Sequence, residues 1–303
     1  MTILKISGLD KSYGSVHAVK NLHLEVKKGQ VFGILGPNGS GKTTTLAMLL
    51  GVVRMNKGTY SWFSQPPGPA NQQKIGSMLE SPNFYPYLNL IENLKITCRI
   101  KRFPEAEVFR VLKVVGLLER QKSKFQTLSL GMKQRLALAS VLLGDPEVLV
   151  LDEPANGLDP EGIAQVREII RKEAKKGKTI IMASHILVEV EKVCSHVAIL
   201  RKGELLASGE VGSLLRNDVK MVLASDAMDE LQQFLHSFEG VTSMVVESDH
   251  IQVILKEGFA PGDLNKAVVK NGIILNKMEE HKQSLEEQFL ELVKKDEMKG
   301  GLG

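Results

Sequence analysis

The stretch GPNGSGKT, residues 36–43, constrains this chain more than any other part of its sequence. It fits the pattern GxxxxGK[ST], follows the apolar run 31–35 and opens a second apolar segment. The pattern predicts a strand, a glycine-rich loop and a helix, whose backbone N–H groups and positive dipole end surround a chain of phosphates. A glycine-rich turn with a chance Lys-Thr is the alternative, and the flanking strand and helix patterns argue against it.

The polar residues of this loop have separate expected roles. Lys42 would reach the β- and γ-phosphates of a nucleotide, and the Thr43 hydroxyl would bind Mg²⁺. The candidate nucleotide-binding residues are Gly36, Pro37, Asn38, Gly39, Ser40, Gly41, Lys42, Thr43 and Thr44.

Two adjacent carboxylates, Asp152 and Glu153, follow the apolar run 148–151. Ligands of open α/β sheets gather where the strands end, so both carboxylates should lie near the bound phosphates. We expect Asp152 to hold Mg²⁺, through water, and Glu153 to polarise the water that attacks the γ-phosphate. An apolar strand that ends in Asp is weak evidence alone, but a second Asp159 and the preceding loop strengthen it.

His185 follows the next β-branched run, 179–183, together with Ser184. A single His is more often a surface residue, but this position would bring its imidazole to the γ-phosphate. We therefore expect Glu153 and His185 to form the catalytic pair. Tyr13 lies 23 residues before the loop and is a candidate for stacking on adenine, although packing is the ordinary role of such a Tyr.

The arrangement of apolar runs predicts an α/β fold. Strand-like runs alternate with amphipathic segments, which indicates a mostly parallel sheet covered by helices. Period-two alternation before residue 30, around a turn at Tyr13-Gly14, predicts antiparallel strands at one edge. Residues 82–144 have little strand signal and should form an inserted helical lobe.

Residues 213–303 have a different pattern and should form a small accessory α+β domain. We expect strands at 219–223, 241–247, 250–255 and 273–278, with helices at 226–238, 264–271 and 284–294. The order βαββαβ plus a last helix suggests a ferredoxin-like fold. The first domain would then span residues 1–212.

Composition narrows the class of protein. The net charge of +4, from 39 basic and 35 acidic residues, is spread along the chain, so no nucleic-acid partner is expected. Cys98 and Cys194 lie far apart, which argues against a disulfide or metal site. The N-terminus has no signal-peptide pattern, and runs such as 46–53 are too short to span a membrane.

The segments GPNGSGKTT, LSLGM, VLVLDEP, GLDP and SH, in this order and spacing, resemble the motifs of ATP-binding subunits of ABC transporters. The resemblance covers residues 1 to about 212. It implies a P-loop NTPase of ABC type that binds ATP and Mg²⁺. It also implies a homodimer or heterodimer of such subunits, which works with a separate polytopic membrane permease. The chain would lie at the cytoplasmic face of the membrane.

The start of the helix after Thr127 gains a second interpretation from this resemblance. Ser129 alone could simply cap the helix. In the family, the segment at 128–132 usually reads LSGGQ and meets the nucleotide of a second subunit. The resemblance therefore implies that Ser129, Leu130 and Gly131 face the γ-phosphate in trans.

Two departures from the family pattern are visible. Leu130 and Met132 replace a Gly and the Gln of the usual pentapeptide. Glu80 stands where the family usually has a glutamine, and its carboxylate can still ligate Mg²⁺ or its water. LSLGMKQRLALA and LESPNFYP are most similar to the bacitracin- and lantibiotic-exporter branch.

The implied function is an ATP-hydrolysing motor that drives export of an antimicrobial peptide or a similar compound. Export of ions or lipids is an alternative, and so is a soluble ABC-type ATPase that acts on ribosomes or DNA. A non-catalytic regulatory subunit is disfavoured because Lys42, Asp152, Glu153 and His185 are all present. The aromatic residues Phe84, Tyr85 and Tyr87 lie in the segment that the family uses to contact the permease; a small core in the helical lobe is the other interpretation.

Overall fold

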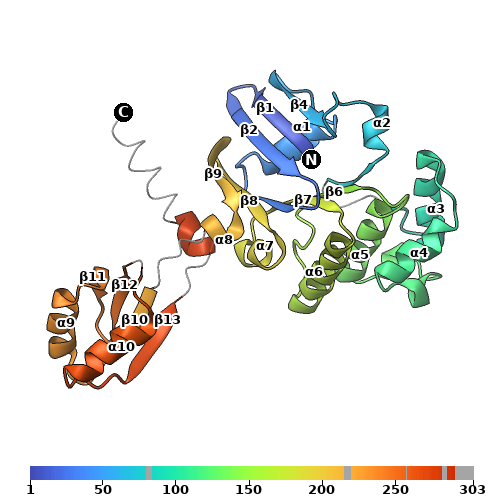
Figure 1. Ribbon diagram of the computed structural model, residues 1–303. Coiled ribbons are helices and arrows are strands. Elements are labelled where there is room, and N and C mark those ends of the chain that lie inside the picture. Colours follow the sequence, from blue (N-terminus) through green and yellow to red (C-terminus); the bar gives the residue numbers. More distant parts are fainter. Residues whose placement is uncertain (80–83, 215–219, 257, 282–284, 291–303) are drawn as a thin grey trace. The chain divides into compact units, whose positions relative to one another are not determined.

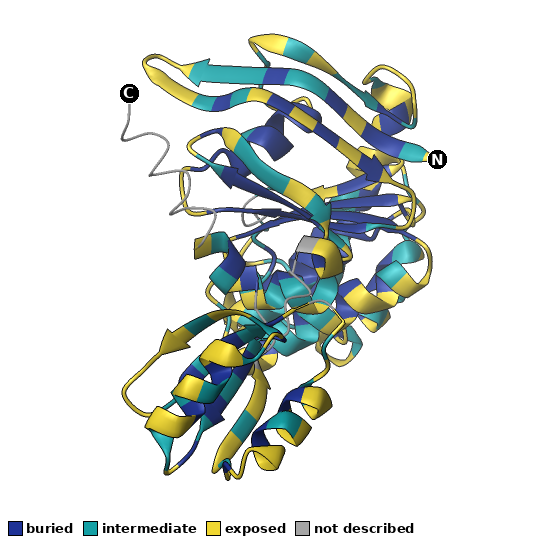
Figure 2. Cartoon of the chain, turned by 60° about the vertical axis from the view of Figure 1, so that its left-hand side comes forward, coloured by how far each residue is buried: buried dark blue, intermediate teal, exposed yellow. Residues whose placement is uncertain are grey.

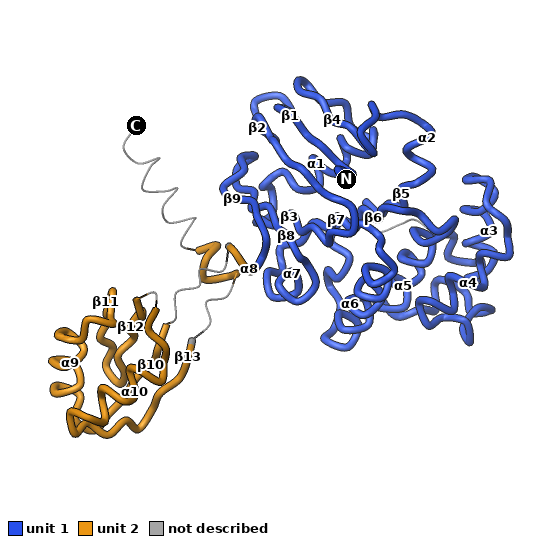
Figure 3. The backbone as a smooth tube through the Cα atoms, viewed as in Figure 1, with its two compact units in different colours: residues 1–211 blue, residues 212–303 orange. Residues whose placement is uncertain are grey.

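The computed structural model describes residues 1–79, 84–214, 220–256, 258–281 and 285–290. The chain divides into two compact units, residues 1–211 and 212–303 (Figure 3). Each unit is described by itself below.

A six-stranded sheet forms the centre of the first unit, in the order β5-β6-β7-β3-β8-β9 (Figure 1). All neighbours pair in parallel except β8 and β9, which are antiparallel. The predicted mostly parallel sheet is thus confirmed, with β9 as an antiparallel edge strand. The strands are β3 (Val31–Leu35), β5 (Ile75–Met78), β6 (Val148–Asp152), β7 (Thr179–Ser184), β8 (His196–Arg201) and β9 (Glu204–Glu210).

Helices cover the central sheet, so its inner strands are buried on both faces. Every residue of β3, β6 and β7 is buried, and Figure 2 shows these strands in dark blue. Such strands read as continuous apolar runs because no face meets water. α1 (Lys42–Leu49) contacts β6 and β7, whereas α6 (Pro160–Lys175) contacts β7 and α7 (Leu187–Val193) contacts β3.

The first two strands are antiparallel, as predicted, but they belong to a separate three-stranded sheet of order β2-β1-β4. These strands are β1 (Thr2–Tyr13), β2 (Val16–Lys27) and β4 (Lys57–Trp62). β1 uses its second edge to pair with β4, which leaves neither β1 nor β2 in the central sheet. Their apolar faces share a core with β3 and β6, and Trp62 at its centre donates its indole N–H to the Leu49 carbonyl at 2.9 Å.

The helical lobe lies between β5 and β6 in the chain, as expected. Its helices are α3 (Leu90–Lys101), α4 (Glu107–Val114) and α5 (Leu130–Val141), with 3₁₀ turns at Leu118–Arg120 and Phe125–Thr127; a short α2 (Pro69–Gln72) precedes β5. Asn89 and Glu92 form a capping box that starts α3. Residues 82 and 83, the first of the predicted lobe, lie outside the described part of the chain.

The second unit contains a four-stranded antiparallel sheet of order β11-β12-β10-β13. After α8 (Val211–Leu214), the elements are β10 (Lys220–Ala224), α9 (Met228–Ser237), β11 (Val241–Val246), β12 (Ile251–Leu255), α10 (Pro261–Lys270) and β13 (Lys277–His281). The order βαββαβ is the predicted one. Residues 285–290 are helical, within the expected last helix.

The last strand of this sheet begins later than predicted. The apolar pattern placed it at 273–278, whereas β13 starts at Lys277. Gly272 ends α10 with a φ of +77°, and the buried Ile273 reaches the core from the following loop. A buried apolar residue in a loop thus mimicked the start of a strand.

Candidate functional site

The loop between β3 and α1 has the shape that the glycine-rich pattern predicts. Gly41 precedes α1 with a φ of +102°, in the left-handed region that favours glycine. A Cβ atom at Gly41 would lie 2.4 Å from the Ala18 carbonyl oxygen, and one at Gly36 would lie 2.2 Å from the Leu200 carbonyl oxygen. Because these carbonyl oxygens leave no room for a side chain, only glycine fits at positions 36 and 41.

Lys42 is buried in this loop, with 5% of its side chain exposed. Its ammonium group donates to the carbonyls of Gly36 at 2.8 Å and Pro37 at 3.2 Å, and lies 3.4 Å from Glu153 Oε1. Ser40 is buried too, and its hydroxyl has no hydrogen-bond partner within the described residues. A buried ammonium and an unpartnered hydroxyl in one loop suit an anionic ligand such as a phosphate.

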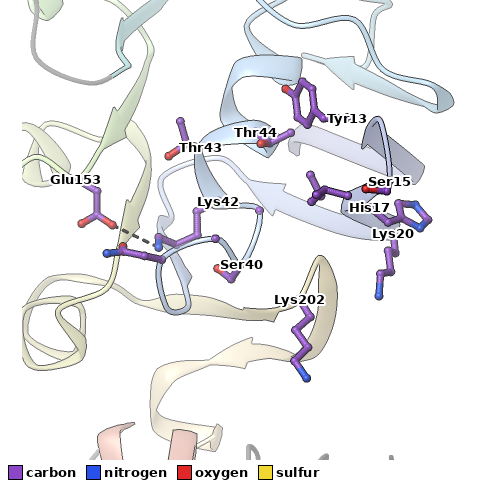
Figure 4. A pocket seen from close by; sticks show the side chains of 15 residues that line it. Tyr13, Ser15, His17, Lys20, Ser40, Lys42, Thr43, Thr44, Glu153 and Lys202 are labelled. Atoms are coloured by element: carbon purple, nitrogen blue, oxygen red, sulfur yellow. Dashed lines mark ion pairs between the residues drawn. The ribbon is translucent and has the colours of Figure 1, made fainter.

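The two carboxylates lie at the end of β6, as the sequence predicts. Asp152 is the last residue of the strand and is 3% exposed. Glu153 has a φ of +46° and donates its backbone N–H to the Ala183 carbonyl of β7 at 3.0 Å. A non-glycine residue in this conformation is strained and is typical of functional sites. Glu153 thereby leaves the strand direction and turns its carboxylate toward Lys42 (Figure 4).

His185 meets Glu153 at the same edge of the sheet. Its Nδ1 atom lies 2.9 Å from Glu153 Oε2, and its backbone N–H donates to the same oxygen at 3.4 Å. β3, β7 and β6 are consecutive neighbours in the sheet, so their carboxyl ends bring Lys42, His185 and Glu153 together. The predicted cluster of a cation, a carboxylate and an imidazole is therefore assembled.

A pocket of about 680 Å³ opens over the loop (Figure 4). Tyr13 lines it from the end of β1 and is 48% exposed, with Lys11 Nζ 4.8 Å from its ring centre. Thr43 and Thr44 at the start of α1 also line the pocket. Sequence reasoning missed the other lining residues, which carry no motif and come from the β1–β2 turn, β2 and the β8–β9 turn: Ser15, Val16, His17, Ala18, Lys20 and Lys202.

Ser129 caps α5 and stays exposed. Its hydroxyl accepts a hydrogen bond from the Met132 N–H at 3.3 Å, and the Leu130 side chain beside it is 55% exposed. These residues and Gly131 line a second pocket of about 400 Å³, between the start of α5 and residues 157–165. The structure thus places the Ser129 segment outside the Lys42 pocket of its own chain. Glu80 lies outside the described residues.

The acidic and imidazole groups alone do not make a metal cage. Within the described ranges, no three His, Cys, Asp or Glu side chains are grouped so that they could hold a metal ion. The two predicted oxygen donors within the described residues are the exposed Thr43 hydroxyl at the start of α1 and the buried Asp152 carboxylate at the end of β6. This set suits Mg²⁺, which is bound by one or two protein oxygens together with phosphates and water.

Comparisons with known proteins agree with this architecture. The family model described as ABC transporter matches residues 19–156. The bacitracin transport ATP-binding protein BcrA of Bacillus licheniformis is 38% identical over 299 residues, 96% of this chain and 97% of the relative. The lantibiotic transport ATP-binding protein SrtF of Streptococcus pyogenes is 38% identical over 208 residues, 69% of this chain and 91% of its own length.

Solved structures match about 70% of this chain. An ATP-binding subunit of an ABC transporter has 28% identity and a TM-score of 0.63, covering 71% of this chain and 92% of its own. The protein cbiO1 from Clostridium perfringens, part of the ABC transporter complex cbiONQ, has 29% identity and a TM-score of 0.63, covering 69% and 88%. Because the similarity to BcrA of Bacillus licheniformis extends over nearly the whole of both chains, this chain belongs to the ATP-hydrolysing, ATP-binding subunits of ABC transporters.

Proposed function

We propose that two copies of this chain, or this chain and a close relative, bind ATP between them and drive a membrane permease. The observation that carries this proposal is the position of Ser129. It lies exposed at the start of α5 and lines a different pocket from Lys42. One chain therefore offers two separate half-sites, and a head-to-tail pair would join the loop of each copy to the helix start of the other.

Each half-site has its own role in this proposal. Residues 36–44 surround the phosphates, and Tyr13 stacks on adenine. Across the interface, Ser129, the N–H groups near Leu130 and Gly131, and the dipole of the twelve-residue α5 face the γ-phosphate. ATP draws the copies together because the closed dimer binds it more tightly than the open one does.

Thr43 and Asp152 hold Mg²⁺ in this proposal, with Glu80 as a third oxygen donor. The metal supplies charge neutralisation to the phosphates. Glu153 accepts the proton of the attacking water, and its 2.9 Å contact with His185 holds the carboxylate in place. In this proposal the His185 imidazole, held beside this carboxylate, also meets the γ-phosphate. Hydrolysis then lets the copies separate.

The partner we propose is a separate polytopic permease at the cytoplasmic face of the membrane. Among the helices that the structure describes, none has the length and hydrophobicity of a membrane span. Phe84 packs on Phe125 with ring centres 5.2 Å apart, so it serves the lobe core. Tyr85 and Tyr87 are 48% and 63% exposed, which supports a contact with the partner.

We propose that the transported compound is an antimicrobial peptide. Support comes from the printed functions of the relatives, bacitracin transport for BcrA and lantibiotic transport for SrtF. BcrA matches the second unit as well as the first, since its similarity covers 96% of this chain. Co-expression of this chain with its permease in a sensitive host should raise resistance to such peptides. Resistance that stays at the level of an empty vector would contradict this assignment.

Complementation between two inactive variants tests the shared site. Lys42→Ala disables the loop and leaves the Ser129 face intact, whereas Ser129→Arg does the reverse. Each variant alone should have little ATPase activity. An equal mixture should recover about a quarter of the parental rate, because half of the dimers are mixed and each mixed dimer has one intact site. A mixture as inactive as its components would overturn the head-to-tail arrangement.

A further inference from the structure

The phosphate-binding loop is held from outside by two segments that carry no motif. One is residues 17–20 of β2, and the other is the end of β8 with the turn that leads into β9, residues 200–203. The Ala18 carbonyl closes against Gly41, and the Leu200 carbonyl closes against Gly36, at distances that exclude a Cβ atom. The loop is therefore fitted between two backbone segments far from it in the sequence.

Gly203 links these two segments to the loop. Its N–H donates to the Ser40 carbonyl at 3.2 Å, and its own carbonyl accepts the Lys20 N–H at 2.8 Å. Gly203 is buried with a φ of +83°. A Cβ atom there would lie 2.9 Å from the carbonyl oxygens of both His17 and Ala18. Only a glycine can take this conformation and fit this close to β2.

A side-chain ion pair also joins β2 to the segment that carries Gly203. Lys20 Nζ lies 2.9 Å from Glu204 Oε1, so the residue after Gly203 is paired with the residue that binds the Gly203 carbonyl. Lys20 and Lys202 both line the nucleotide pocket, on the side opposite Glu153 (Figure 4). The pair is solvent-exposed and adds little energy, so the backbone bonds carry most of the connection.

We infer that Gly203 is a positioning residue for nucleotide binding, acting through Ser40. A glycine-rich loop loses much conformational freedom when it closes on phosphates, and a loop already fixed in the binding shape loses less. The Gly203 hydrogen bond fixes the carbonyl of Ser40, whose buried hydroxyl has no partner within the described residues. This inference rests on the assignment of the pocket to ATP, and it holds whether or not two copies share the site.

Gly203→Ala tests the inference, with ADP as the probe because ADP needs no partner half-site. Isothermal titration of the full-length chain should show ADP binding weakened by about tenfold. Gly177→Ala is a control for backbone strain, since Gly177 has a φ of +86° and open space around it. Gly58→Ala is a control for strain with a clash, since Gly58 has a φ of +91° and its Cβ atom would lie 2.2 Å from the Gly8 carbonyl oxygen.

The two controls separate positioning from general destabilisation. Both should lower the thermal midpoint and keep the parental affinity for ADP at a temperature where all variants are folded. Equal affinities in Gly203→Ala and Gly58→Ala would overturn the positioning role. Failure of the parental chain to bind ADP would instead reject the pocket assignment, and the inference with it.

A second measurement needs no variant. In the parental chain, ADP should slow amide hydrogen exchange at the N–H of the buried Gly203, which donates to the Ser40 carbonyl. The N–H of Gly177 serves as the reference amide and should exchange at an unchanged rate. Exchange at Gly203 that does not respond to saturating ADP would contradict the inference even if Gly203→Ala failed to fold.

Discussion

The Glu153 carboxylate and the His185 imidazole are in direct contact, with Oε2 and Nδ1 2.9 Å apart. Both residues leave the ends of adjacent parallel strands, and the backbone N–H of Glu153 binds the neighbouring strand at Ala183. The other carboxylate oxygen of Glu153 lies 3.4 Å from Lys42 Nζ. Glu153 thus stands between Lys42 and His185, and in our proposal this carboxylate accepts the proton of the attacking water.

Glu153→Gln should retain ATP binding and stall turnover. The amide keeps the shape and the hydrogen-bonding reach of the carboxylate but cannot accept the proton of water, so phosphate release should fall about 10²- to 10⁴-fold. Because ATP is no longer consumed, gel filtration with ATP should show an accumulated dimer. Phosphate release at the parental rate would remove Glu153 from the role of base.

His185→Ala should lower the rate and preserve nucleotide affinity. The imidazole contacts Glu153 rather than the loop, so its loss should reduce kcat about 10²-fold while the ATP concentration at half-saturation changes little. His23→Ala is the matched control, because His23 contacts Asn21 in β2 and does not line the pocket. A rise in half-saturation with an unchanged kcat would place His185 in binding instead.

Tyr13→Ala should weaken ATP binding about tenfold, since stacking of a base on an aromatic ring contributes roughly 1–3 kcal/mol. Tyr13→Trp should restore most of the affinity, because any flat aromatic ring offers a face to adenine. GTP should bind with similar affinity, because stacking on Tyr13 does not depend on the hydrogen-bonding groups at the edge of the base. Equal affinities for ATP in the parental chain and in Tyr13→Ala would show that Tyr13 does not stack on adenine and serves packing only.

The site could be predicted from the sequence where a residue with a recognisable chemical role directly follows an apolar strand. The loop, the carboxylates and His185 follow strands whose apolar runs are unmistakable, and parallel pairing brings their ends together. The contributions of Lys20 and Lys202 were not predictable, because they reach the pocket through pairings between distant segments. The same holds for β1 and β2. Period-two alternation identified them as strands, but only the pairing with β4 decides which sheet they join.

Asp145→Asn should destabilise the first unit by about 1 kcal/mol at pH 7, a small value because the Asp145 side chain is mostly exposed. Its oxygen lies 2.6 Å from the buried Lys178 Nζ, and this hydrogen bond holds the pKa of the Asp145 carboxyl below its ordinary value of 3.8. Asn tolerates the φ of +50° at this position, so the substitution isolates the charge.

The sign of the pH dependence follows from the lowered pKa of Asp145. The stabilisation is fully present above the unfolded-state pKa and is lost as the pH falls below it, through the folded-state pKa. Urea unfolding of the parental chain and of Asp145→Asn should therefore differ at pH 7, and the difference should shrink as the pH falls below 3.8. A constant difference across this range would attribute the effect to lost packing rather than to charge.

Tyr87→Ala should uncouple the subunit from its permease and leave the ATPase rate of the isolated chain unchanged. Tyr87 is 63% exposed and its ring centre lies 6.0 Å from that of Tyr85, so the two rings offer one apolar contact surface.

The buried Asn93 holds this segment through hydrogen bonds with Tyr85, Leu88 and Asn89. Asn93→Ala should therefore reduce co-purification with the permease as well, at a cost of about 1–3 kcal/mol in stability. Phe109→Ala, at an aromatic residue on α4 that is 49% exposed, is the control and should co-purify normally. If Tyr87→Ala remained bound and fully stimulated by the permease, the contact would have to lie elsewhere on the lobe.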